Sequence, residues 1–167
     1  MTTCTAAETG RPAQPGGALL RIDDNADDLL LFELAWEKIG VANPIRCVTC
    51  RKDAIDYLEG HGKFADRNAF PLPAIIVTDM RLPDGNASEL VRWIRAHPEH
   101  YRIVVIVLSG TAHQEEVNEA YRSGANSFLL KSPNPCQLHN TVSLIQSYWL
   151  NQNFPPGPLL AGRSISL

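Results

Sequence analysis

The sequence has no long hydrophobic run and no excess of positive charge. Its 167 residues carry a formal net charge of −3 at pH 7, which gives the protein no overall attraction to nucleic acid or to an anionic membrane surface. No apolar stretch approaches the length that spans a bilayer, and the first residues lack the basic-then-apolar order of a secretion signal. We therefore expect a cytoplasmic protein that has neither nucleic acid nor a membrane as its partner.

Cysteine and histidine are also scarce, with four and five residues respectively. Cys47 and Cys50 form a C-x-x-C pair, but they lie in the β-branched run PIRCVTC and have no second pair of ligands. We expect neither a zinc site nor a redox centre there. The histidines are scattered without metal-ligand spacing, so a histidine metal site and a catalytic triad are not expected either.

Composition divides the chain into three parts. Residues 1–17 are rich in Thr, Ala, Gly and Pro without apolar periodicity, which predicts a flexible leader. Residues 18–150 are enough for one folded domain with a single core. Residues 151–167 contain a Pro-Pro-Gly-Pro run that excludes helix. They are expected to form a tail, with no effector domain after it.

Short apolar runs alternate with helical patterns along residues 18–150. The apolar runs are ALLRI, PIRCV, AIIVT, IVVIVL and SFLL. Helices are expected from Ala26, near Arg51, after Pro83, after Ala112 and from about Pro135. This alternation predicts an α/β fold, a doubly wound five-stranded parallel sheet with helices on both faces.

The spacing of apolar residues predicts the buried side of two of these helices. In the first helix the stripe consists of Leu30, Leu31, Leu34, Ala35 and Ile39. In the last helix it consists of Leu138, Val142, Ile145 and Trp149.

Polar side chains follow the predicted strands at the points where the strands end. Asp23 and Asp24 follow the first strand, Asp79 the third, Ser109 the fourth and Lys131 the fifth. In a parallel α/β sheet these positions converge on one crevice. Clustered carboxylates repel one another unless a divalent cation or a lysine compensates their charge, and Mg²⁺ is the expected cofactor. Such a site suits phosphoryl transfer to Asp79.

The other acidic residues near the first strand need no chemical role. They belong to the segment IDDNADD, in which Asn25 is the expected N-cap of the first helix. Asp27 and Asp28 then occupy the first helical turn, where a carboxylate is stabilised by free N–H groups and by the positive end of the helix dipole. We expect capping to be their function.

Four motifs together resemble the receiver domain of two-component signalling, the fold of the bacterial chemotaxis response regulator. They are Asp23-Asp24, TDMRLPDG around Asp79, LSGTA around Ser109, and SGANSFLLK ending at Lys131. The resemblance covers residues 18–150 and implies a flavodoxin-like (βα)5 fold. It also implies a signalling phosphoprotein that accepts a phosphoryl group from a histidine kinase and catalyses only its own phosphorylation and dephosphorylation.

The resemblance assigns a role to each residue of the site. Asp79 is the implied phosphoacceptor. Asp24 and Asp79 are implied ligands of Mg²⁺ together with the main-chain carbonyl of Arg81, and Asp23 assists them. The implied switch residues are Ser109, Lys131 and Phe128, which would bias the face formed by the fourth helix, the fifth strand and the fifth helix. Receivers often have a cis bond after this lysine, but Ser132 separates Lys131 from proline, and a cis bond before a residue other than proline costs about 2.5–4 kcal/mol, so the sequence leaves the isomer of this bond open.

A narrower similarity lies near the end of the chain. LLKSPN followed by SYWLNQNFPP is similar to the single-domain response regulators that partner cyanobacterial and bacterial phytochromes. It implies a bacteriophytochrome-type histidine kinase as the partner, and a homodimer to which the last helix and the tail contribute. The interface candidates are Trp149, Phe154 and Leu159.

Three alternative functions fit the sequence less well. A phosphatase or phosphotransferase of the haloacid dehalogenase type also uses a strand-end aspartate and Mg²⁺, but Arg81 stands where its second aspartate belongs. A flavodoxin-like redox module needs a phosphate-binding loop after the first strand, where the aspartates would repel phosphate. A receiver-like scaffold that works without phosphorylation would not need the complete set of acceptor residues.

Overall fold

The structure is a computed structural model, and it describes residues 17–152 of the chain. Within that range, five strands form one parallel sheet in the order β2-β1-β3-β6-β7. These strands are β1 (Ala18–Ile22), β2 (Ile45–Val48), β3 (Pro73–Asp79), β6 (Val104–Ser109) and β7 (Ser127–Leu130). The five-stranded parallel sheet predicted from the sequence is confirmed.

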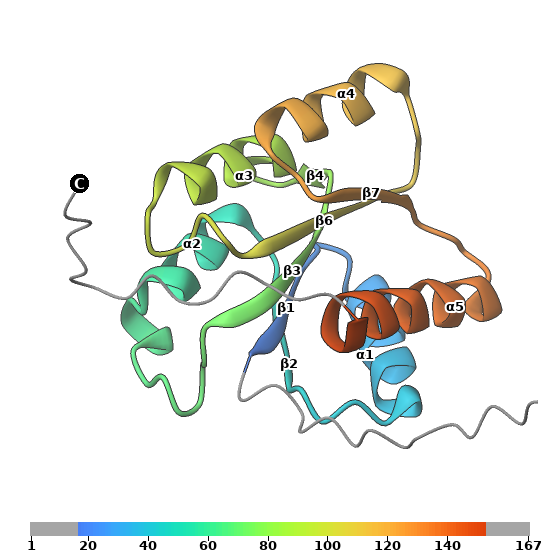
Figure 1. Cartoon of the computed structure of the whole chain (residues 1–167), viewed down its shortest axis with the longest axis horizontal. Coiled ribbons are helices and arrows are strands. Elements are labelled where there is room, and N and C mark those ends of the chain that lie inside the picture. The colour runs from blue at the N-terminus through green and yellow to red at the C-terminus, as the bar shows by residue number, and fades with distance from the viewer. Residues whose placement is uncertain (1–16, 153–167) are drawn as a thin grey trace, which may run out of the picture.

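Helices cover both faces of the sheet, with α1 and α5 side by side on one face and α2, α3 and α4 on the other (Figure 1). Their bounds are α1 (Ala26–Ile39), α2 (Arg51–Glu59), α3 (Ala87–Ala96), α4 (Gln114–Ser123) and α5 (Pro135–Ile145). Four short elements complete the described chain, namely η1 (Gly62–Phe64), β4 (Arg81–Leu82), β5 (Gly85–Asn86) and the π-helical η2 (Gln146–Gln152). The doubly wound α/β fold is confirmed.

The central strands β3 and β6 are buried on both of their faces. Ile76 and Val105 belong to the core beneath α2, α3 and α4. Ile75, Val77 and Ile106 belong to the separate core beneath α1 and α5. Because successive side chains of a strand point to opposite faces, a strand between two cores must be apolar at every position. This requirement explains the apolar residues 75–77 of β3 and 104–108 of β6.

Local capping fixes where α1 begins and ends. The Asn25 side chain accepts hydrogen bonds from the main-chain N–H groups of Asp27 and Asp28, at 2.9 and 3.3 Å. The helix ends at Gly40, whose φ of 74° lies in the left-handed region that glycine adopts without steric cost. The predicted N-cap and helix end are both confirmed. The first turn of α1 is thereby held at the end of β1.

The predicted buried face of α1 is wrong for three leucines. Leu30, Leu31 and Leu34 are 54%, 42% and 52% exposed, whereas Phe32 and Trp36 are buried. Leu30 and Leu34 lie two residues from Phe32 and Trp36, which is roughly 200° around the helix. The two aromatic rings are stacked and bury more apolar area than leucines do, so they take the face toward the sheet.

The predicted stripe of the last helix is confirmed. Val142 and Ile145 are buried, and Leu138 and Trp149 are partly buried against the same core. Phe154, Leu159 and residues 1–16 of the predicted leader lie outside the described residues. All peptide bonds of residues 17–152 are trans, including the bond after Lys131. No helix in this range is long and apolar enough to cross a membrane.

Candidate functional site

The carboxyl ends of β1, β3, β6 and β7 meet at one edge of the sheet. The register pairs Ile22 with Thr78, Asp79 with Leu108, and Ser109 with Leu130. The residues that follow these strands therefore come together although they are far apart in the sequence. This edge lies where the strand order reverses between β1 and β3, the position at which open α/β sheets bind their ligands.

Three aspartates gather at this edge as the sequence predicted. Asp23, Asp24 and Asp79 each offer a carboxylate oxygen, and these oxygens lie within 4.8 Å of one another. Asp23 is fully buried, Asp79 is partly buried and Asp24 is exposed. The donor set consists of hard oxygen atoms and is open on the side of Asp24. It fits a divalent cation such as Mg²⁺, which keeps several waters in its coordination shell.

Lys131 supplies a positive charge inside the same cluster. Its Nζ atom donates to Oδ2 of Asp23 at 2.7 Å, to Oδ2 of Asp28 at 2.9 Å and to Oδ2 of Asp79 at 2.9 Å. Burial by itself lowers the pKa of Lys131, but the three hydrogen-bonded carboxylates outweigh burial and raise this pKa above its ordinary value. The ammonium group therefore stays charged at neutral pH.

Asp28 has a larger role than the sequence indicated. We expected both Asp27 and Asp28 to act only in the first turn of α1, and for Asp28 that expectation is incomplete because its carboxylate binds Lys131. Asp27 is exposed and forms no ion pair with Lys131, in keeping with a capping role. The sequence offers one indication of this role, because the first turn of α1 closely follows the end of β1, where the site residues gather.

Ser109 lies at the end of β6 and is almost fully buried. Its Oγ atom accepts a hydrogen bond from the main-chain N–H of Thr111 at 3.3 Å. Its main-chain carbonyl accepts a hydrogen bond from the N–H of Lys131 at 2.7 Å. The ends of β6 and β7 are thus tied together directly beside the charged cluster.

Comparison with known proteins agrees with this geometry. The family model of the response regulator receiver domain matches residues 19–143. The chain belongs to the response regulator receiver family. It is a phosphoryl-accepting signalling domain. Among curated proteins, the probable methanogenesis regulatory protein FilR2 of Methanothrix harundinacea is 31% identical over 140 residues, which cover 84% of this chain and 88% of that protein.

Several solved receiver structures are similar over 85% of this chain. The response regulator RPA3017 in red light signalling of R. palustris is 27% identical, with a TM-score of 0.79 and 99% of that chain covered. The phosphorylated cyanobacterial phytochrome response regulator RcpA is 26% identical, with a TM-score of 0.76 and full coverage of that chain. The Mn²⁺-bound form of Rcp1 of Synechocystis is 25% identical, with a TM-score of 0.75 and full coverage.

The receiver's expected aromatic switch residue lies on β7. Phe128 is partly buried and packs against the core beneath α2, α3 and α4. Its main-chain N–H donates to the hydroxyl oxygen of Tyr121 on α4 at 3.3 Å. Through this main-chain hydrogen bond Phe128 connects β7 with α4. The switching roles of Ser109 and Phe128 stay predictions.

A bridge across the receiver site was not predicted from the sequence. Glu116 of α4 accepts from the Arg81 guanidinium and from the Thr111 hydroxyl, both at 3.0 Å. The hydrogen bond from Arg81, followed by that from Thr111, lowers the pKa of the Glu116 carboxyl. Arg81 comes two residues after Asp79, and Thr111 comes two residues after Ser109. The bridge therefore joins the loops that follow β3 and β6.

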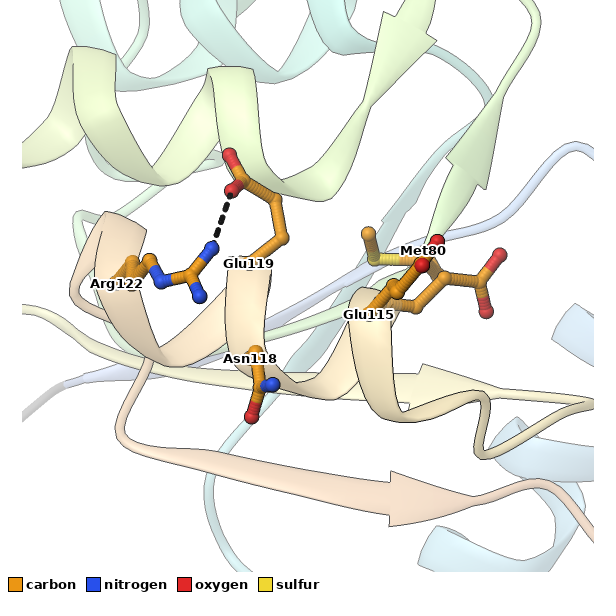
Figure 2. Close-up of a pocket in the computed structure, with 6 residues that line it drawn as sticks. Met80, Glu115, Asn118, Glu119 and Arg122 are labelled. Carbon is orange, nitrogen blue, oxygen red and sulfur yellow. Dashed lines mark ion pairs between the residues drawn. The ribbon is translucent and has the colours of Figure 1, made fainter.

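Beside this bridge α4 borders an open depression of about 520 Å³ (Figure 2). The residues that line it are Met80, Glu115, Glu116, Asn118, Glu119 and Arg122. Glu119 forms ion pairs with Arg122 of its own helix and with Arg92 of α3. Its lining comes from α4 and from Met80 and includes no residue of β7 or α5, so the depression lies beside the predicted output face of α4, β7 and α5.

A buried arginine is the second feature that the sequence analysis missed. Arg21 lies in β1 and is 1% exposed. Its guanidinium forms an ion pair with Asp23 and lies over the ring of Phe32, 5.4 Å from the ring centroid. The run ALLRI predicts an apolar strand. The charged residue within it is the feature of the sequence that indicates a buried ion pair.

Crowding of like charges predicts that one substitution at the site increases stability. Asp24→Asn removes a charge near Asp23 and Asp79 while leaving both ion pairs of Asp23 in place. We expect the free energy of unfolding without divalent cations to rise by about 1 kcal/mol at low salt. Urea denaturation measures this change, and the gain should shrink at high ionic strength.

Asp27→Asn is the matched control, because Asp27 is exposed in the same region but makes no contact with the cluster. It should lower stability by about 0.3–1 kcal/mol, since it removes a favourable charge at the helix start. Equal changes in the free energy of unfolding for the two substitutions would contradict the idea that the carboxylates of the cluster repel one another.

Proposed function

We propose that Asp79 is the phosphoacceptor of this receiver, that the reaction depends on Mg²⁺, and that a histidine kinase is the phosphodonor. The observation that carries the proposal is the contact of the Lys131 ammonium group with Asp79, in a cluster where Asp23 and Asp24 offer further carboxylate oxygens within 4.8 Å. A carboxylate held beside an ammonium group and a cation site is suited to receive a phosphoryl group.

In the proposed reaction an oxygen of Asp79 attacks phosphorus. The bond from phosphorus to the histidine nitrogen of the kinase breaks as the new bond forms. Asp24, Asp79 and the main-chain carbonyl of Arg81 would hold Mg²⁺, with Asp23 assisting. The bound cation would neutralise charge on the phosphoryl oxygens. Lys131 would then pair with these oxygens, and the Ser109 hydroxyl would donate a hydrogen bond to them.

The acceptor assignment is tested by Asp79→Asn. Incubation of the unchanged protein with acetyl phosphate and MgCl₂ should give an acid-stable, base-labile phosphoryl adduct, because an acyl phosphate is the product. Asp79→Asn should give no adduct, because the amide is not a nucleophile. Intact-mass spectrometry detects the added phosphoryl group, and Asp27→Asn serves as the control that should label normally. Unchanged labelling of Asp79→Asn would refute the assignment.

The alternative functions receive less support from the site. In a haloacid dehalogenase-type enzyme, the residue two positions after the nucleophile acts as an acid and base. Here Arg81 occupies that position, and its guanidinium is paired with Glu116. A scaffold that works without phosphorylation gives no reason for Lys131 to contact three carboxylates. We therefore propose a protein that catalyses only its own phosphorylation and dephosphorylation.

An apolar patch beside the site supports a protein as the phosphodonor. Leu30, Leu31 and Leu34 of α1 are exposed, and we call them the α1 leucine patch. Leu31 lies together with Lys131 in the lining of a small cavity next to the site. Clustered exposed leucines mark protein contact surfaces. A kinase bound to this patch would hold its phosphohistidine close to Asp79.

Substitution of the patch should separate the two phosphodonors. For Leu30→Ser/Leu34→Ser we expect transfer from the cognate kinase to slow about tenfold or more, because two apolar contacts are lost. Labelling by acetyl phosphate should change by less than about twofold, because the site is untouched. Time courses of quenched phosphotransfer reactions compare the rates with the two phosphodonors. Leu72→Ser, an exposed leucine before β3, is the control, and an equal loss with both donors would contradict docking at this patch.

We also propose a phytochrome-type sensor kinase as the upstream partner, with the reaction in the cytoplasm. The support is that similar solved receivers are named for phytochrome and for red light signalling, together with the LLKSPN and SYWLNQNFPP segments. Output would pass through protein contacts or through phosphate relay to another protein. Profiling of phosphotransfer from candidate kinases identifies the partner.

Self-association through the end of the chain is a further part of the proposal. Trp149 is partly buried within its own chain. Leu144 and Tyr148 beside it are 67% and 53% exposed, so among the described residues they are open to contact with a second copy. Phe154 and Leu159 of the tail remain interface candidates from the sequence.

A chain that ends at Gln152 should show the molar mass of a monomer in light scattering, about half that of the full chain. Tyr148→Ser in the full chain should weaken the same dimer. A shortened chain that keeps the full oligomeric state would exclude the tail from the interface.

A further inference from the structure

Arg21 places a second positive charge behind the site, on the side away from solvent. Its side chain is 2% exposed. The Nη1 atom donates to the main-chain carbonyls of Ile22 at 2.8 Å and Val77 at 3.2 Å, and the Nη2 atom donates to Oδ2 of Asp23. The guanidinium is therefore fixed to β1, to β3 and to a carboxylate of the site at the same time.

Both oxygens of Asp23 are occupied by donors. Oδ1 accepts from the main-chain N–H of Asn25 at 3.0 Å, and Oδ2 accepts from Arg21 and from Lys131. The charge of Asp23 is thus shared between two cations that differ in exposure. Arg21 is enclosed, whereas the Lys131 side chain is 20% exposed and also serves Asp28 and Asp79.

Phosphorylation of Asp79 would change the balance of charge around Asp23. New negative charge on Asp79 attracts Lys131, and every shift of Lys131 toward that charge weakens its bond with Asp23. A buried carboxylate left without a cation is strongly unfavourable. With Arg21 in place, Asp23 keeps a counter-ion wherever Lys131 points.

We propose that Arg21 is a positioning residue that acts as the permanent counter-ion of Asp23, so that Asp23 attracts a divalent cation less strongly and Lys131 is free to follow the charge on Asp79. The inference rests on the proposed Mg²⁺-dependent function. Arginine suits the task because its guanidinium stays charged and holds several acceptors in fixed directions, which a lysine cannot do. The ring of Phe32 covers the guanidinium and keeps it in place.

The test compares Mg²⁺ binding by the full chain and by Arg21→Met, with isothermal titration calorimetry at constant ionic strength. Methionine fills similar space without charge. We expect the Kd for Mg²⁺ to fall about tenfold in Arg21→Met, because Asp23 then offers the cation an uncompensated charge. Arg21→Lys, which keeps the charge, should stay within about threefold of the unchanged protein.

Two further measurements separate positioning from a merely structural role. Arg21→Met/Asp23→Asn removes both members of the pair and should lose the gain in Mg²⁺ affinity shown by Arg21→Met, because the uncompensated charge is no longer there. Thermal unfolding with and without MgCl₂ should show a larger gain in Tm for Arg21→Met than for the unchanged protein. This second readout works even when the variant is destabilised without Mg²⁺.

The outcomes are distinct. A Kd for Arg21→Met equal to that of the unchanged protein would overturn the inference, and so would a variant that stays unfolded at every Mg²⁺ concentration, because Arg21 would then serve folding alone. If the unchanged protein binds no Mg²⁺, the proposed function itself fails. The two failures therefore cannot be confused.

Discussion

The ammonium group of Lys131 lies between carboxylates that the chain brings from three segments, the end of β1, the first turn of α1 and the end of β3. The partners Asp23 and Asp79 are 108 and 52 residues away in the sequence. Negatively charged carboxylates this close repel one another, and the positive charge of Lys131 among them offsets that repulsion. Every other feature of the site depends on that balance of charge.

The sheet makes this balance possible because it fixes the strand ends without using the site residues for packing. Two separate cores hold β3 and β6 from both sides. The polar side chains after these strands therefore do not have to hold the strands in place, and they interact with one another through charge and hydrogen bonds. Because the Lys131 N–H also bonds the Ser109 carbonyl, movement of β7 at this point is linked to β6. The Glu116 bridge links the loops after β3 and β6 in the same way.

The five strands, the helix positions and the clustering of three aspartates could be predicted because each follows from a local pattern or from the rule that parallel strands end at one edge. The buried face of α1 could not, because Leu30 and Phe32 have similar hydrophobicity and only the space against the sheet decides between them. Asp27 and Asp28 satisfy the same capping rule, and only Lys131, 103 residues further on, distinguishes them. Arg21 and Glu116 likewise gain their roles from tertiary partners.

The two cations at the site illustrate why a buried ion pair is kept even where it adds little stability. Replacing a buried pair by apolar side chains is often neutral or favourable for stability, so stability alone does not explain Arg21. A site that gains and loses a phosphoryl group must tolerate changing charge without repacking its interior. In the proposed arrangement Arg21 is enclosed and stays paired with Asp23. Lys131 is more exposed and binds several acceptors, so it can respond to a change of charge on Asp79. The ion pair of Arg21 and Asp23 then contributes to the function of the site as much as Lys131 does.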